Sequence, residues 1–257
     1  MLAFLLVCAG GVFLVGLALD ALTGPFSARP VCSAGGERLS PEQTANAAII
    51  TAVGLDMGAP ERAITIALAT ALQESSLRNL DHGDRDSLGL FQQRPSQGWG
   101  SPEQVQDEVY ASRAFFSRLL AVEDYAGMPL TQAAQRVQIS AFPGAYAKHE
   151  TRADAFAAAL SGTSAHALSC DLPESAGLDQ GRFLAELSRS YPAVTVSGVG
   201  AEIHLSGAAG DPWALAHWAI ATAEKTGVSQ VRYADMVWTR AEGWRAGNGA
   251  VDRVAVR

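Results

Sequence analysis

Basic residues are scarce in this chain of 257 residues. Lys and Arg together number 19 against 26 Asp and Glu, which gives a formal net charge of −7. A nucleic-acid-binding domain would show a basic patch or stripe, and none is visible. We therefore expect no nucleic-acid partner. The length and the 48% share of hydrophobic residues are sufficient for a sizeable buried core.

Charge is also missing from the N-terminal segment. Residues 2–19 contain no charged side chain, and no Lys or Arg precedes Arg29. A secretory signal peptide has a basic start and a small-residue cleavage site, and neither is evident here. Although this run is at the short end for a membrane span, we predict a signal anchor or transmembrane helix within residues 1–22. The chain would then be a single-pass protein of the cell membrane with extracytoplasmic domains.

One carboxylate follows the most apolar helical pattern of the chain. Residues 63–72 leave a helix almost no polar face, so this helix should be central to the core and should deliver Glu74 at its end. Burial and the negative C-terminal end of a helix should both raise the pKa of Glu74. General-acid cleavage of a glycoside needs such a protonated carboxyl group. The alternative is a solvated glutamate, which is the commonest situation.

A polar loop separates Glu74 and Ser75 from the GLFQ run of residues 89–92. These motifs resemble the Glu-Ser…Gly-Leu-Met-Gln signature of soluble lytic transglycosylases and goose-type lysozymes. The phrase GDRDSLGLFQQRPSQGWG resembles the lysozyme-like domains of actinobacterial cell-envelope proteins. The resemblance covers residues 39–162. It implies a mainly α lysozyme-like domain that cleaves the MurNAc–GlcNAc bond of peptidoglycan with Glu74 as catalytic acid, without a metal or organic cofactor.

The same resemblance suggests which residues bind the sugar. Ser75 should support the acid and the helix end, and Gln92 falls on the family's glutamine beside the cleft. Gln92 and Gln93 offer amide donors and acceptors suited to sugar hydroxyls and N-acetyl groups. Residues 142–143 are Phe-Pro where the family has Tyr-Asn, and we expect the phenol of Tyr146 to compensate. Half-buried packing of Tyr146 is the alternative.

The loop after Glu74 contains Asp81, Asp84 and Asp86. Inverting hydrolysis needs a second carboxylate that activates water, and Asp84 or Asp86 could supply it. Lytic transglycosylases need none, because the 6-hydroxyl of the substrate attacks and leaves a 1,6-anhydro end. Solvated turn residues are the ordinary alternative for these aspartates. Hydrolase and transglycosylase therefore both stay open, with the transglycosylase as the main prediction.

The chain has three cysteines. Cys8 lies in the apolar N-terminal segment and needs no partner, whereas Cys32 and Cys170 bracket the lysozyme-like region. In an oxidising compartment these two could form a disulfide that closes a loop around the domain. Two unrelated free thiols are the alternative, and spacing does not decide between them.

The C-terminal part resembles a second kind of module. The stretch DPWALAHWAIATAEKTGVSQVRYADMVW is similar to the last domain of actinobacterial envelope proteins related to zinc D,D-peptidases. Those relatives tend to end in an Asp-His-Val-His-Val strand, and Arg253 and Ala255 replace both histidines here. Three zinc ligands cannot be assembled without them. We predict that this small α+β domain binds no metal and is non-catalytic.

Together these patterns predict a mainly α lysozyme-like domain plus a small α+β C-terminal domain, preceded by a transmembrane helix. The expected parts are an anchor at 1–22, a tether at 23–38, the lysozyme-like domain at 39–162, a linker at 163–180 and the α+β domain at 181–257. The expected partners are peptidoglycan strands, the membrane and an envelope-spanning machine. A non-catalytic glycan-binding or scaffold protein on the same fold is the alternative function.

Overall fold

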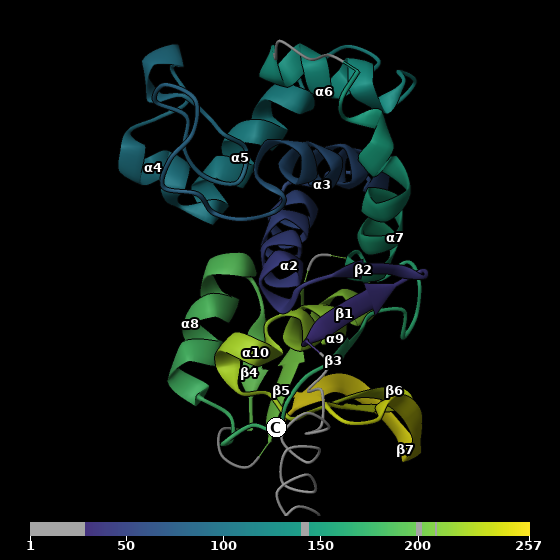
Figure 1. Cartoon of the computed structure of the whole chain (residues 1–257). Helices are drawn as coiled ribbons and strands as arrows, with labels where there is room; N and C mark the ends of the chain where they lie inside the picture. The colour runs from purple at the N-terminus through teal and green to yellow at the C-terminus, as the bar shows by residue number, and fades with distance from the viewer. Residues whose placement is uncertain (1–28, 140–143, 199–201, 209) are drawn as a thin grey trace, which may run out of the picture.

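In a computed structural model of the chain, residues 29–139, 144–198, 202–208 and 210–257 are described (Figure 1). Helices account for 45% of these described residues and strands for 19%. The helices that follow one another in the first half lie together at one end of the molecule, and the strands lie at the other end (Figure 1). The candidate site belongs to the helical end.

The helical end contains six described α-helices, three of which begin at a side-chain cap. They are α2 (Pro41–Asp56), α3 (Glu61–Ser75), α4 (Pro102–Gln106), α5 (Glu108–Leu119), α6 (Leu130–Gln138) and α7 (Glu150–Leu160). At the start of α2, the Ser40 hydroxyl accepts a hydrogen bond from the Gln43 N–H, and the Gln43 side chain accepts one from the Ser40 N–H. Ser101 caps α4 in the same way, but the helix breaks at Asp107, which caps α5 in turn.

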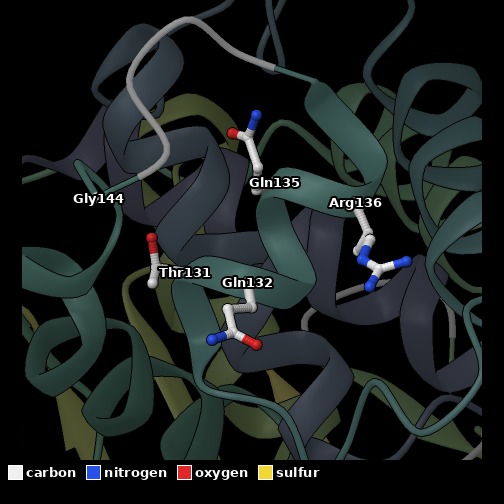
Figure 2. Close-up of a pocket in the computed structure, with 5 residues that line it drawn as sticks. All are labelled: Thr131, Gln132, Gln135, Arg136 and Gly144. Atoms are coloured by element: carbon white, nitrogen blue, oxygen red, sulfur yellow. The ribbon is translucent and has the colours of Figure 1, made fainter.

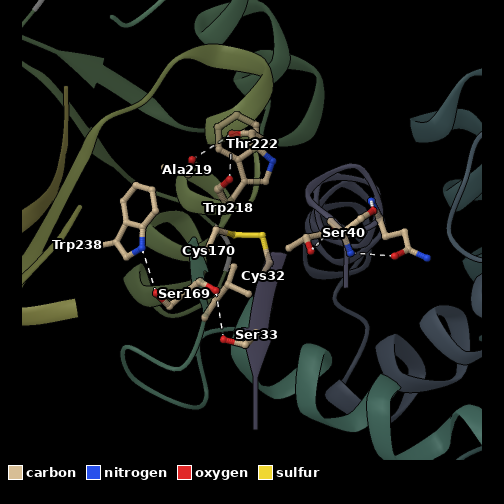
Figure 3. Close-up of a disulfide and its surroundings, with 12 residues drawn as sticks. Cys32, Ser33, Ser40, Ser169, Cys170, Trp218, Ala219, Thr222 and Trp238 are labelled. Atoms are coloured by element: carbon tan, nitrogen blue, oxygen red, sulfur yellow. Dashed lines mark hydrogen bonds between the residues drawn. A yellow bond between two sulfur atoms is a disulfide. The ribbon is translucent and has the colours of Figure 1, made fainter. Parts of the chain in front are cut away.

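A small antiparallel sheet joins segments that are distant in the sequence. Its strands are β1 (Val31–Ala34), β2 (Glu37–Leu39) and β3 (Ser169–Asp171), in the order β2-β1-β3. Gly35 and Gly36 form the turn between β1 and β2 with φ of 55° and 81°, the conformation that a tight two-residue hairpin requires. Cys32 and Cys170 lie directly opposite each other on β1 and β3 and form a disulfide (Figure 3). The disulfide prediction is therefore confirmed.

The strand-rich end contains a second antiparallel sheet and its helices. The elements are α8 (Gln180–Ser190), β4 (Thr195–Ser197), β5 (Ile203–Ser206), α9 (Pro212–Ala221), α10 (Ala223–Thr226), β6 (Gln230–Thr239) and β7 (Gly243–Val256). The sheet has the order β4-β5-β7-β6. Asp211 caps α9, and the helix is buried along almost its whole length because it contacts both this sheet and α2.

The two ends share one hydrophobic core. Helix α2 contacts α3, α5 and α7 as well as α9, and it runs from the helical end into the strand-rich end (Figure 1). The cluster of buried side chains extends from Phe91 and Phe115 to Trp218 and Trp238, the last two beside the disulfide (Figure 3). The candidate site and the C-terminal part therefore pack on one continuous core, while the division into domains at 39–162 and 181–257 stays a prediction.

The expected fold class is wrong. The structure is mixed α/β with two antiparallel sheets rather than mainly α with an N-terminal transmembrane helix. The difference arises because part of the predicted tether, residues 23–38, forms β1 and β2, and part of the predicted linker, residues 163–180, forms β3. Among the described residues no helix is long and apolar enough to cross a membrane. Residues 1–22, for which the transmembrane helix was predicted, lie outside the described part of the chain.

Candidate active site

Glu74 lies in the last turn of α3, half-buried and facing a cleft. The helix reaches this point through an uninterrupted buried run, residues 63–72, and ends at Ser76, whose backbone is left-handed with φ of 54°. Burial raises the pKa of the Glu74 carboxyl above its ordinary value. The direction agrees with the sequence prediction, and it keeps a proton on this group at a higher pH than on a solvated glutamate.

Two neighbours hydrogen-bond to the carboxyl group of Glu74. The Tyr146 hydroxyl donates to Glu74 Oε1 at 2.7 Å, and Gln138 also hydrogen-bonds to the same carboxyl. Both bonds lower the pKa of Glu74, but burial has the larger effect. Gln138 is fixed in turn because its amide donates to the carbonyl oxygen of Phe91 at 2.7 Å. The carboxyl group is therefore oriented as well as desolvated.

Tyr146 is the predicted site residue whose placement is most informative. Its side chain has no exposed surface, so it is fully buried rather than half-buried as the packing alternative supposed. It precedes the short helix η2 (Ala147–His149), which packs against α3. The Phe-Pro segment at 142–143 lies outside the described residues. Tyr146 is therefore placed to orient the Glu74 carboxyl group.

The turn that follows the polar loop is joined directly to the end of α3. The Ser75 hydroxyl donates to the carbonyl oxygen of Leu90 at 2.7 Å and accepts from the N–H of Arg78 at 3.2 Å. Leu88 and Gln93 close the turn through reciprocal backbone hydrogen bonds of 3.0 Å. Gly89 is required because its φ is 79° and a Cβ atom there would lie 2.2 Å from a backbone oxygen of α4. Ser75 therefore connects the two motifs that the sequence singles out.

The two glutamines of the turn point in different directions. Gln92 lines the cleft, and its amide donates to the carbonyl oxygens of His82 and Gly89 at 3.2 and 3.3 Å. Gln93 is 1% exposed, and its amide donates to the carbonyl oxygen of Ala111 in α5. Gln92 can therefore meet a ligand, whereas Gln93 anchors the turn to α5 and is not placed to bind sugar.

The aspartates of the loop also differ. The Asp84 side chain is 93% exposed at the rim of the cleft, where its closest charged neighbour is Arg85 at 4.0 Å. Asp86 accepts hydrogen bonds of 2.8 Å from Arg94 Nε and from the N–H of Ser96, and these bonds hold the pKa of Asp86 well below its usual range. Asp86 is thus already engaged, so Asp84 is the freer candidate for a second carboxylate.

The cleft around Glu74 has a volume of about 490 Å³ and a largely polar wall. Its lining residues are Gln73, Glu74, Asp84, Arg85, Ser87, Gln92, Arg94, Gln97, Trp99, Gln138 and Ile139. Trp99 is mostly buried, and the Arg118 guanidinium stacks 3.4 Å above its ring. Amides of this kind, beside an aromatic edge, suit the hydroxyl and N-acetyl groups of a sugar. Neither Gln138 nor Arg94 was predicted as a site residue: Gln138 lies far from the two motifs, and Arg94 lies in the longer phrase that carries the resemblance but outside the Glu-Ser and GLFQ motifs.

A second pocket of about 380 Å³ lies along α6. Figure 2 shows Thr131, Gln132, Gln135 and Arg136 on this helix, with Gly144 across the hollow. Its described lining contains no carboxylate, so it offers no group for acid catalysis. The Glu74 cleft is therefore the better candidate for an active site.

The C-terminal sheet offers no alternative centre among the residues that the structure describes. No group of three or more His, Cys, Asp or Glu side chains there or elsewhere in the described ranges could hold a metal ion. His204 on β5 lies opposite Ala255 on β7, so no second histidine faces it there. His217 is fully buried in α9, and its Nδ1 contacts the Ala159 carbonyl oxygen at 2.5 Å. It is a packed histidine.

The cleft thus combines a desolvated, oriented carboxyl group with amides and arginine side chains at its rim. No family model matches the chain, and no curated protein matches it either.

Proposed function

We propose that the protein cleaves the glycan strands of peptidoglycan as a lytic transglycosylase, with Glu74 as its catalytic acid and base. The observation that carries the proposal is the burial of Glu74 in a polar cleft with the Tyr146 hydroxyl 2.7 Å from its Oε1. Burial favours the neutral acid that the first step of glycoside cleavage consumes. The motif resemblance supplies the substrate, the bond between MurNAc and GlcNAc.

In the first step Glu74 gives its proton to the glycosidic oxygen, and the bond from that oxygen to the MurNAc anomeric carbon breaks. In the second step the Glu74 carboxylate takes the proton of the MurNAc 6-hydroxyl, whose oxygen bonds to the anomeric carbon. The glutamate is then protonated again, and the product has a 1,6-anhydro end. The hydrogen bonds from Tyr146 and Gln138 stabilise the carboxylate that exists between the two steps.

Two observations favour this single-carboxylate reaction over hydrolysis. Asp86 is held by Arg94 and Ser96, and the Asp84 side chain is 93% exposed to solvent, so neither is fixed in the cleft to position a water molecule. The location outside the cytoplasm is supported by the Cys32–Cys170 disulfide, since disulfides persist in oxidising compartments. The reducing cytosol also lacks the substrate.

Mass spectrometry of the muropeptides released by the purified protein tests the proposal. We expect 1,6-anhydro products from the wild type and from Asp84→Asn, and a decrease of about 10²–10⁴-fold for Glu74→Gln. Glu42→Gln, at an exposed site on α2, is the matched control and should cleave like the wild type. Reducing ends that disappear in Asp84→Asn would show hydrolysis instead. Equal rates for wild type and Glu74→Gln would contradict the assignment of the acid, and glycan binding without any cleavage would show a scaffold protein.

A further inference from the structure

Arg94 is a positively charged residue held at the wall of the cleft. It immediately precedes the short helix η1 (Pro95–Gln97), and its side chain is 22% exposed and faces the same cavity as Glu74. Arg85, the other arginine of the lining, is 70% exposed at the rim beside Asp84. Of the two arginines in the described lining of the cleft, Arg94 is therefore the one whose position is fixed.

Asp86 fixes the orientation of Arg94. One carboxylate oxygen accepts from Arg94 Nε at 2.8 Å, and the other accepts from the backbone N–H of Ser96 at 2.8 Å. Arg94 Nη2 donates in addition to the Ser96 hydroxyl at 3.4 Å. These contacts occupy Nε and, weakly, Nη2. Among the described residues no acceptor engages Nη1, so the outer edge of the guanidinium group keeps N–H donors for a ligand.

This arrangement suits a second carboxylate better than a neutral sugar. The planar fork of a guanidinium group matches the two oxygens of a carboxylate, and hydrogen bonds between charged groups are about twice as strong as neutral ones. Asp86 sits behind the fork and limits the rotamers of Arg94, so little side-chain entropy remains to be lost on binding. The neutral hydroxyl and N-acetyl groups of the ligand have the side-chain oxygen of Gln92 and the amide of Gln97 instead.

We propose that Arg94 recognises a carboxylate carried by the glycan strand and thereby selects muramic-acid-containing strands over uncharged GlcNAc polymers. The inference rests on the proposed function for the location of the ligand. Two parts of peptidoglycan carry this chemistry: the lactyl group of a MurNAc without a stem peptide, and the free carboxylates of a stem peptide. In either case Arg94 is a specificity residue, and Asp86 is its positioning residue rather than a catalytic base.

Calorimetric titration on the Glu74→Gln background tests the inference, because this variant binds without cleaving. Three tetrasaccharides separate the possibilities: a neutral chito-oligosaccharide, an alternating GlcNAc–MurNAc strand with free lactyl carboxylates, and the same strand with stem peptides attached. We expect Arg94→Gln to weaken binding of a carboxylate-bearing strand by about 10- to 100-fold and to leave the neutral ligand within about twofold. The strand that is affected identifies the source of the carboxylate.

Two further variants serve as controls. Arg94→Lys keeps the charge, and so the ion pair with Asp86, but lacks the fork; its affinity should lie between those of the parent and Arg94→Gln. Arg113→Gln removes an arginine that pairs with Asp56 outside the cleft and should bind like the parent. An equal loss for the neutral and the charged ligands, or no binding of any of the three to the parent, would overturn the inference.

The binding titration and the cleavage assay together distinguish failure of this inference from failure of the proposed function. Selective loss of carboxylate binding in Arg94→Gln, together with a wild type that releases no fragments, would retain the recognition role and reject the enzyme. Cleavage by the wild type without any selectivity at Arg94 would do the reverse.

Discussion

At the scale of single residues, the pKa of Glu74 links function to stability. Its folded-state pKa is raised above the ordinary value of 4.5 by burial. Between pH 4.5 and the raised pKa of Glu74, the folded protein binds more protons than the unfolded chain. The free energy of unfolding therefore decreases as the pH rises through that range. Above the raised pKa, the folded state contains a partly desolvated carboxylate.

Glu74→Gln should therefore raise the melting temperature at pH 7 and lose this advantage below about pH 4.5. The amide is neutral at every pH, and its oxygen can still accept the hydrogen bond from Tyr146. Thermal unfolding of both proteins between pH 3.5 and 8 measures the difference. A melting-temperature gap that does not change with pH would contradict the raised pKa, and Glu42→Gln, on the surface of α2, should show no gap of this kind.

The sequence predicts the direction of the pKa shift of Glu74, but it predicts only some of the residues around Glu74. An apolar helix that ends in a glutamate is sufficient to predict a raised pKa, and Tyr146 is expected nearby from the resemblance. Gln138 and Arg94 could not be predicted in the same way, because their contacts join the end of α6 and the residue before η1 to the same cleft wall as the GLFQ turn. The opposite directions of Gln92 and Gln93 likewise depend on the closed turn, since Gln92 has a φ of 49°.

At the scale of helices and strands, the N-terminal caps of helices were easier to predict than short strands. Ser40 and Ser101 begin helices as their sequences predict, because a cap is a local set of hydrogen bonds. The strands β1 to β3 were not predicted, since each has only three or four residues and β1 pairs with β3 across a long stretch of sequence. The Gly-Gly pair at 35–36 is typical of a hairpin turn as well as of a flexible tether.

The C-terminal end of α6 carries an unusual residue. Ile139 adopts a left-handed backbone conformation with φ of 52°, and its side chain is 83% exposed at the wall of the cleft. Glycine commonly ends a helix in this conformation, and a β-branched residue there is strained. Burial therefore does not explain an isoleucine at this position.

Ile139→Gly should stabilise the protein by up to about 1 kcal/mol, because the relief of left-handed strain exceeds the added entropy of the unfolded chain. Ile139→Ala, which keeps the side-chain strain at Cβ, should stabilise it less. Urea denaturation at equilibrium provides both values. A glycine variant less stable than the wild type would show that Ile139 makes contacts in solution which its exposure does not suggest.

At the scale of the whole molecule, the disulfide closes a loop of sequence separation 138 around the helical end. In the chain-entropy model a loop of this length stabilises the folded state by about 5 kcal/mol. Both sulfur-bearing residues are fully buried beside Trp218 and Trp238, so reductants should reach them only on unfolding.

We therefore expect a single reactive thiol, Cys8, in denatured protein that has not been reduced. Mass spectrometry after alkylation should find one label on the full chain and three after reduction. The variant with Cys32→Ala and Cys170→Ala serves as the comparison for stability, and its melting temperature should be much lower. Three labels without reduction would contradict the disulfide and remove its support for a location outside the cytoplasm.

The same covalent link determines how the molecule would carry a mechanical load. A pulling force applied between a point before Cys32 and a point after Cys170 passes from β1 to β3 through the sulfur–sulfur bond. The intervening chain, which includes α3, the turn at 88–93 and the whole Glu74 cleft, lies outside the path of tension. Tension between the two segments that flank the disulfide would therefore leave the residues between Cys32 and Cys170, Glu74 among them, unextended.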